Sequence, residues 1–205
     1  FFSRNDWTSA AIQSFQIAIA VMVVATTIGT LASLALMRGT FRGKQLLNVL
    51  LVSPIIIPNI VVAIAIFGFY STLRLTGSYI GMVLAHSVFA LPFVIIVLTA
   101  TLRGFDMNLE HAAQNLGASP IRTFRYITLP IIAPGVFAAA LFSFIASFEE
   151  LIIALFIAGA QSRTLPIRMF EGLRLEIDPT IAAVSTMLIV LTVSAFGVAE
   201  ILRQR

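Results

Sequence analysis

The chain has 205 residues, of which 59% are hydrophobic and 11% are charged, with a formal net charge of +4 and a mean hydropathy of +1.02. A soluble domain carries roughly 25% charged residues, so this composition excludes an ordinary water-soluble protein and predicts a membrane protein. The absence of cysteine excludes disulfides, a thiolate nucleophile and a cysteine-based metal site. His86 and His111 are too few for a metal site, so we expect neither a metal centre nor a catalytic residue.

Five apolar segments are expected to cross the membrane as helices, because about 20 apolar residues span the hydrocarbon core. In chain order they cover residues 12–37, 46–73, 78–102, 131–155 and 179–202. Residues 151–158 are apolar but too short to cross alone, so they either extend the fourth span or turn back. The sequence therefore predicts an all-α polytopic bundle that forms a single transmembrane domain over residues 1–205.

The orientation is predicted from the basic residues, which concentrate on the cytoplasmic flanks of membrane helices. One side carries Arg38, Arg42, Lys44, Arg103, Arg122, Arg125, Arg203 and Arg205, and the other carries Arg4, Arg74, Arg163, Arg168 and Arg174 among acidic residues. We therefore expect the N-terminus outside, the C-terminus in the cytoplasm, a cytoplasmic loop at 103–130 and an extracytoplasmic loop at 159–178. The positive net charge then reflects topology, and no nucleic-acid partner is expected.

The cytoplasmic loop has the pattern of two short helices joined at a glycine. Asn108 is expected to cap the first helix, and Gly117 to end it in a left-handed conformation. Ser119 and Pro120 are expected to cap and begin the second helix, which would end at Leu129-Pro130 before the fourth span.

This loop presents small side chains that another protein could hold in a cleft. Ala112 and Ala113 form a bare face and Leu116 gives one apolar contact. Packing of the loop against the chain's own membrane helices is the alternative, and the pattern alone does not separate the two.

The loop resembles the EAA loop of binding-protein-dependent ABC transporter permeases in the spacing of Ala112-Ala113, Gly117 and Ile127-Thr128-Leu129-Pro130. The segments SPIIIPNIV, FALPFVIIVLTATLRGFD and LPIRMFEGLRLEIDPTIAAVST are similar to the type I permease subunits of spermidine/putrescine importers. The resemblance implies the type I importer permease fold, whose usual sixth span is expected before Phe1, and a loop that docks on a cytosolic ATPase. The residues it assigns to this coupling are Glu110, His111, Ala112, Ala113, Leu116, Gly117, Ala118, Ser119, Pro120, Leu129 and Pro130.

The chain departs from the family pattern at one position of the loop. His111 occupies the usual glutamate position, and Glu110 stands just before it. Either Glu110 supplies the charge from a shifted position, or the contact with the ATPase is weaker or pH-sensitive.

The resemblance also implies the partners. They are a cytosolic ATPase dimer, a second permease that is a paralogue of this chain, an extracytoplasmic solute-binding protein and the lipid of a bacterial inner membrane. The chain has no G-x-x-x-x-G-K-[ST] phosphate loop, since the nearest string, Gly39 to Gln45, is one residue short and lacks the final hydroxyl. ATP and Mg²⁺ are therefore expected on the ATPase, and this chain is expected to be a non-enzymatic subunit without a cofactor.

Two places are predicted to line the translocation path. Pro58, with Asn59 beside it, leaves backbone carbonyls unpaired in the second span, which is tolerated against a neighbour or a wet cavity. An ordinary proline kink is the alternative. Glu149 and Glu150 lie near the outer face, where carboxylates are costly unless they face water or a cavity. They would suit the polyamine-type cation that the resemblance implies, although solvation at the interface also accounts for them.

The extracytoplasmic loop is expected to contain an amphipathic surface helix begun by Thr164 and Pro166, on which a binding protein could dock. Asp178 and Pro179 are expected to cap and begin the fifth span.

Other classes of membrane protein stay open at this point. An ion-coupled secondary transporter or channel working without an ATPase usually has ionisable groups near the midplane, which the centres of these spans lack. A purely structural membrane subunit would use the loop for packing alone.

Overall fold

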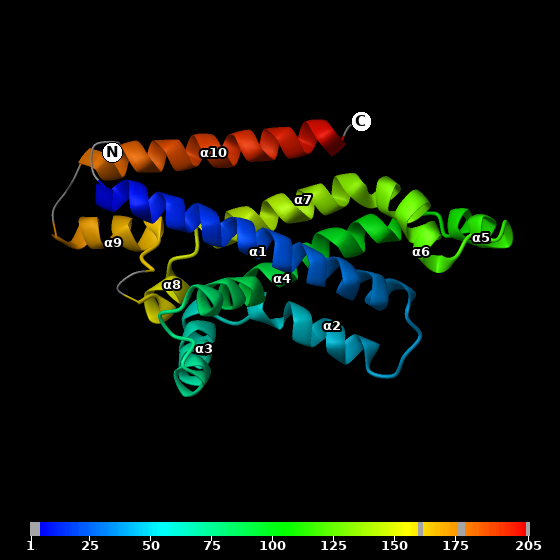
Figure 1. Ribbon diagram of the computed structural model, residues 1–205, viewed down its shortest axis with the longest axis horizontal. Coiled ribbons are helices and arrows are strands. Elements are labelled where there is room, and N and C mark those ends of the chain that lie inside the picture. Colours follow the sequence, from blue (N-terminus) through cyan, green and yellow to red (C-terminus); the bar gives the residue numbers. More distant parts are fainter. Residues whose placement is uncertain (1–4, 160–161, 176–178, 204–205) are drawn as a thin grey trace.

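The computed structural model describes residues 5–159, 162–175 and 179–203, and these residues form helices joined by short links (Figure 1). The α-helices are α1 (Asn5–Arg38), α2 (Lys44–Val52), α3 (Asn59–Leu73), α4 (Tyr79–Arg103), α5 (Asn108–Asn115), α6 (Pro120–Thr123), α7 (Leu129–Phe148), α8 (Ile152–Ile157), α9 (Leu165–Leu175) and α10 (Pro179–Arg203). A 3₁₀ turn, η1 (Ser53–Ile55), follows α2, and a π-helical turn, η2 (Phe124–Thr128), joins α6 to α7. The predicted all-α fold is confirmed for the described part of the chain.

The long helices α1, α4 and α7 pack against one another and form the centre of the bundle. Two glycines allow this close approach. A Cβ atom added at Gly29 of α1 would lie 2.4 Å from Cγ1 of Val94, and one added at Gly135 of α7 would lie 2.3 Å from Oγ1 of Thr101. Small residues at helix crossings are typical of membrane bundles, where close backbone contact replaces the hydrophobic drive.

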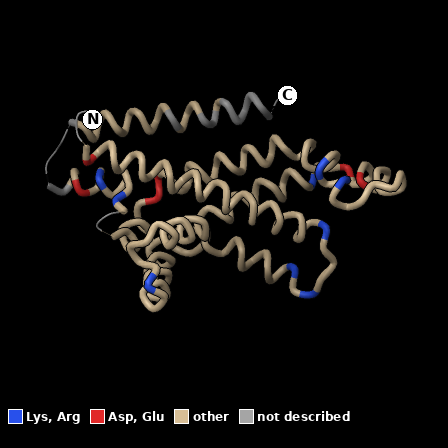
Figure 2. The backbone as a smooth tube through the Cα atoms, in the orientation of Figure 1, with Lys and Arg blue, Asp and Glu red and all other residues tan. Residues whose placement is uncertain are grey.

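Charged side chains gather at the two ends of the bundle and leave the middle of the three long helices uncharged (Figure 2). We call these ends the α5 end and the α9 end, after the short helix that lies at each. Within the described residues, three helical segments could cross a membrane by length and composition: Asn5–Arg38, Tyr79–Arg103 and Pro120–Phe148. They correspond to the first, third and fourth predicted spans.

The second predicted span, 46–73, is not one straight helix. Its halves, Lys44–Ile55 and Asn59–Leu73, meet at an angle of 104°, so the segment is a broken span or a re-entrant loop. Pro58 explains the break, because it has no amide hydrogen and disfavours the helical conformation of the residue before it. The backbone at Pro58 is extended, with φ −53° and ψ 130°, and α3 begins directly after it.

The predicted span 131–155 is also not a single helix. Helix α7 ends at Phe148, and α8 begins at Ile152 and packs against α3 instead of continuing α7. The carboxylate of Glu150 accepts the N–H of Ile153 at 3.0 Å and thereby satisfies the start of the new helix. The apolar residues 151–158 therefore do not extend the fourth span.

Toward its other end, α7 continues without interruption into the loop, so the expected helix end at Leu129-Pro130 is wrong. The π-helical turn η2 lies just before Pro130, and the N–H of Leu129 bonds to the carbonyl of Phe124. Because Pro130 lacks an amide hydrogen, the wider turn accommodates it where a regular helix would be disrupted.

The last helix begins at Pro179, as predicted, whereas Asp178 lies outside the described residues. Its apolar stretch, taken over Thr180–Ser194, is shorter than the three clear spans. With the bent pair counted as one span, up to four segments qualify in the described part of the chain, so the total of five remains a prediction.

Candidate functional site

The loop predicted to dock on a partner forms a knob of α5 and α6 that projects from one end of the bundle (Figure 1). Gly117 lies between the two helices with φ +88°, the left-handed conformation predicted for it. The Oγ of Ser119 accepts the N–H of Arg122 at 3.4 Å, and Pro120 lies in the first turn, so the predicted start of the second helix is confirmed.

The start of α5 differs from the prediction. Asn108 is the first helical residue and makes no capping bond with its side chain. The carboxylate of Asp106 instead accepts the N–H of Asn108 at 2.9 Å. Both residue types are good caps, and here the bond to the start of the helix comes from Asp106, two residues before Asn108.

The tip of the knob is apolar and exposed. Leu116 is 90% exposed and Ile121 is 79% exposed, and His111, Ala112, Gly117, Ser119 and Pro120 are also exposed. Ala113, Ala118 and Leu129 are partly buried, and Pro130 is exposed on the first turn of α7. Clustered exposed apolar side chains on a projecting loop are typical of a surface that another protein covers.

Glu110 is the exception among the residues assigned to the knob, because it points inward. It is only 5% exposed, its carboxylate accepts a hydrogen bond from the hydroxyl of Thr128, and it forms an ion pair with Arg38 at 2.5 Å. Glu110 is therefore not placed to offer its charge to a partner from a shifted position. The exposed residue in the usual glutamate position is His111.

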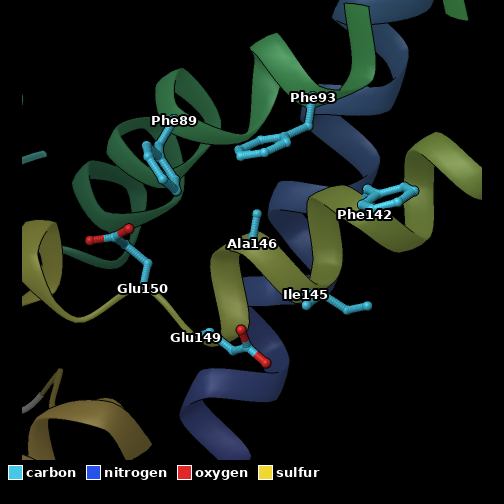
Figure 3. Close-up of a pocket in the computed structure, with 7 residues that line it drawn as sticks. All are labelled: Phe89, Phe93, Phe142, Ile145, Ala146, Glu149 and Glu150. Atoms are coloured by element: carbon cyan, nitrogen blue, oxygen red, sulfur yellow. The ribbon is translucent and has the colours of Figure 1, made fainter. Parts of the chain in front are cut away.

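A second candidate site lies where α7 ends beside α4, toward the α9 end. An open pocket of about 280 Å³ is lined by Phe89, Phe93, Phe142, Ile145, Ala146, Glu149 and Glu150. Phe89 and Phe93 come from α4, and their ring centroids lie 5.8 Å apart. Figure 3 shows these rings opposite Ala146 of α7, with the carboxylates at the end of that helix.

The two carboxylates have different surroundings and leave the backbone in different directions (Figure 3). Glu150 is 5% exposed, and its carboxylate accepts the N–H of Ile153 at the start of α8. Glu149 is exposed and accepts a hydrogen bond from the hydroxyl of Thr192 in α10 at 3.0 Å. Glu149 is thus the exposed carboxylate of the two, whereas Glu150 is buried and already bonded to the backbone of α8.

The structure does not bring Pro58 and Asn59 into this pocket. They lie at the bend between η1 and α3, where Pro58 is exposed and Asn59 is half-buried. The four residues predicted for the path therefore separate into a helix break and a carboxylate pocket.

Sequence reasoning missed the three phenylalanines of the pocket. Phe89 and Phe93 are four residues apart on α4, and Phe142 and Ala146 of α7 and Glu149, directly after it, recur with helical spacing. This periodicity places each set on one helix face and could have identified them. Arg38 and Thr128 were missed as partners of Glu110 because no local pattern links residues so far apart in the sequence.

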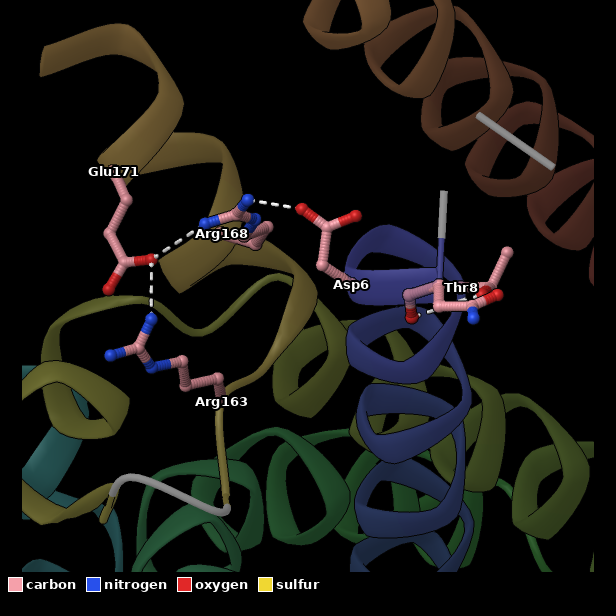
Figure 4. Close-up of polar contacts among 6 residues, drawn as sticks. Asp6, Thr8, Arg163, Arg168 and Glu171 are labelled. Carbon is pink, nitrogen blue, oxygen red and sulfur yellow. Dashed lines mark hydrogen bonds and ion pairs between the residues drawn. The ribbon is translucent and has the colours of Figure 1, made fainter. Parts of the chain in front are cut away.

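Helix α9 lies at the end of the bundle away from the knob. It is fixed there to α1 by polar contacts (Figure 4). The N–H of Leu165 donates to the Oγ of Ser14 at 2.7 Å, and Arg168 forms ion pairs with Asp6 and with Glu171. The helix begins after Thr164, as predicted, but its first turn is buried, since Leu165 is 4% and Ile167 is 5% exposed. The predicted surface helix is therefore anchored to the bundle through one side.

Comparison with known proteins decides the family. The sequence profile of the family described as binding-protein-dependent transport system inner membrane component matches residues 25–205. The chain belongs to this family. It is accordingly a permease subunit of an ABC importer, and the predicted resemblance is confirmed.

Individual relatives agree with this assignment. The chain is 31% identical over 204 residues to the spermidine/putrescine transport system permease protein PotC of Haemophilus influenzae, covering 100% of this chain and 79% of the relative. It is 31% identical over 195 residues to the trehalose transport system permease protein SugB of Mycobacterium tuberculosis, covering 94% and 71%. Its fold is similar to a chain of the MetNI methionine ABC transporter in an inward-facing conformation, with a TM-score of 0.71, 17% identity and coverage of 97% and 93%.

Proposed function

We propose that this permease forms half of a translocation path in a bacterial inner membrane and is coupled to a cytosolic ATPase through the knob of α5 and α6. The single observation that carries the coupling role is the exposed apolar tip, with Leu116 at 90% and Ile121 at 79% exposure around the left-handed Gly117. A second permease, a paralogue of this chain, would complete the path, and a solute-binding protein would deliver the solute. ATP and Mg²⁺ would bind to the ATPase.

The proposed orientation puts the α5 end in the cytoplasm. Arg38, Arg42, Lys44, Arg103, Arg122 and Arg125 lie at this end, where basic residues exceed acidic ones. The α9 end carries Asp6, Glu149, Glu150 and Glu171 together with Arg163 and Arg168, and it would face the outside. This distribution follows the enrichment of basic residues on cytoplasmic flanks.

For the solute, we propose a polyamine-type cation. The pocket at the end of α7 joins the exposed carboxylate of Glu149 to a wall of phenylalanine rings. A carboxylate attracts an ammonium group, and aromatic faces attract it through their quadrupole, by about 0.5–2 kcal/mol per contact. A neutral sugar could donate hydroxyl hydrogen bonds to the carboxylate and pack its C–H groups on the rings, but it has no charge for either group, so the pocket favours a cation over a trehalose-like solute.

The coupling role is tested by purifying the detergent-solubilised chain from its native membrane and identifying every subunit that co-purifies. Gly117→Asp is compared with wild type and with the matched control Gly117→Ala. Both variants strain the left-handed backbone by about 1 kcal/mol, and an added Cβ meets no atom within 4 Å. We expect an ATPase with wild type and Gly117→Ala and none with Gly117→Asp. Recovery of no ATPase with any of the three would favour a transporter that works alone.

The solute is tested by uptake of putrescine and of trehalose into vesicles that contain the whole transporter. Glu149→Gln removes the charge but keeps an oxygen that can accept from Thr192, and Glu149→Asp keeps the charge. We expect putrescine uptake to fall at least roughly fivefold in Glu149→Gln and much less in Glu149→Asp, since charge-assisted contacts contribute about 1.5–3 kcal/mol. Uptake of trehalose alone, unchanged by Glu149→Gln, would reject the cation proposal.

A further inference from the structure

The knob is attached to the bundle through a charged side chain of α5. Among the residues of α5, only Glu110 is buried. An amphipathic helix normally rests on a stripe of apolar side chains. Here the buried contact is a carboxylate, and a buried carboxylate is stable only when it is paired and hydrogen-bonded.

Both groups that satisfy Glu110 belong to other helices. The guanidinium of Arg38, the last residue of α1, lies 2.5 Å from one carboxylate oxygen, and the hydroxyl of Thr128 in η2 donates to the same oxygen. The side chains of Glu110 and Arg38 are 7% and 26% exposed, so the pair is largely shielded from water. The carboxylate therefore joins α5 to two elements that are distant from it in the sequence.

Arg38 is itself held in place on its other side. Its guanidinium carbon lies 5.8 Å from the ring centroid of Phe105, which belongs to the link between α4 and α5. Phe105 packs with Leu102 and Ile132 in an apolar cluster to which Leu34, Met37, Ile127 and Val136 contribute. The ends of α1, α4 and α7 thus meet directly beneath the ion pair.

We infer that Glu110 is a positioning residue which fixes the coupling knob to α1 through Arg38, while Thr128 ties the same carboxylate to η2. The chain itself connects the knob only to α4 and to α7, through η2. The ion pair connects the knob to α1 as well. A force that an ATPase applies at the exposed tip therefore reaches α1, α4 and α7. This inference rests on the proposed coupling function, and it gives Glu110 a role distinct from contact with the ATPase.

The experiment uses the whole transporter in vesicles and the variants Glu110→Gln, Arg38→Gln and the reversed pair Arg38→Glu/Glu110→Arg. Arg42→Gln is the matched control, because Arg42 is exposed in the link that directly follows Arg38 and α1. We expect the single variants to retain the ATPase but to lower solute uptake per ATP hydrolysed at least about fivefold, the lower end of usual coupling between sites. The reversed pair is expected to recover at least half of the loss, and Arg42→Gln to match wild type.

A spin label at Gln114→Cys gives a second readout that does not depend on transport. The native chain has no cysteine, so this label on α5 is unique, and its mobility is measured in the purified permease with and without Glu110→Gln. We expect the label to become more mobile when the charge is removed and to be restored by the reversed pair. Unchanged mobility, or unchanged uptake per ATP in the single variants, would overturn the inference. If wild type binds no ATPase, the proposed function fails, and the label still decides whether Glu110 fixes α5.

Discussion

At each end of the bundle, an ion pair between an arginine and a carboxylate attaches a short helix to α1, but the surroundings of the two pairs differ. At the α5 end, Arg38 and Glu110 are 26% and 7% exposed, and Glu110 is the buried residue of its helix. At the α9 end, Arg168 and Asp6 are 25% and 42% exposed, and α9 is buried through Leu165 and Ile167.

The difference shows that the surroundings of an ion pair determine how much it stabilises the helix it attaches. Around Asp6, water screens the charge, and apolar contacts already hold the helix, so the pair contributes little. Around Glu110, few apolar contacts exist on α5, and the loss of a partner would leave a buried carboxylate. Helix α9 is thus held mainly by the burial of apolar side chains, and α5 is held mainly by the polar contacts of Glu110.

The largest effect is expected from removing burial at the α9 end. Ile167→Ala should lower the free energy of local opening of α9 by about 2–4 kcal/mol, because it leaves a cavity where Ile167 is 5% exposed. Hydrogen exchange of the α9 amides measures this. The control Leu173→Ala, on the same helix and 62% exposed, should change the opening energy by less than about 0.5 kcal/mol. Equal effects of the two variants would show that burial does not hold α9.

A smaller effect is expected at the α5 end when Thr128 loses its hydroxyl. Thr128→Val keeps the shape of the side chain but removes one donor to Glu110, so the opening energy of α5 should fall by about 1–2 kcal/mol. Hydrogen exchange of the α5 amides should then be roughly five to thirty times faster. Thr72→Val, at an exposed position of α3, serves as control and should leave α5 unchanged. Unchanged α5 exchange in Thr128→Val would contradict the role assigned to the polar contacts.

The smallest effect is expected from breaking the exposed pair at the α9 end. Asp6→Asn removes the charge opposite Arg168 and should lower the opening energy of α9 by about 0–1 kcal/mol. Any effect should disappear at high salt, since salt screens exposed charges. The measurement is exchange of the α9 amides at low and high salt. A loss as large as that of Ile167→Ala would remove the contrast between the ends.

Local chemistry explains which parts of the candidate site could be predicted. The left-handed Gly117 and the helix start at Ser119-Pro120 follow from the preferences of a few adjacent residues. The cap of α5 was misassigned because Asp106 and Asn108 are both suitable and lie two positions apart. The inward direction of Glu110 could not be predicted, because its partner Arg38 lies 72 positions away in the sequence.

The membrane class, the three clear spans, the knob and the family could be predicted from contiguous residues, because hydrophobic length, the positions of glycine and proline, and a long motif are local features of the chain. The packed helices were needed to reveal the 104° angle of the bend at Pro58, the departure of α8 from α7, the pocket of phenylalanines and carboxylates, and the burial of Glu110. These features depend on which helix faces supply partners for a broken backbone or a carboxylate. Such partners come together only when helices distant in the sequence pack.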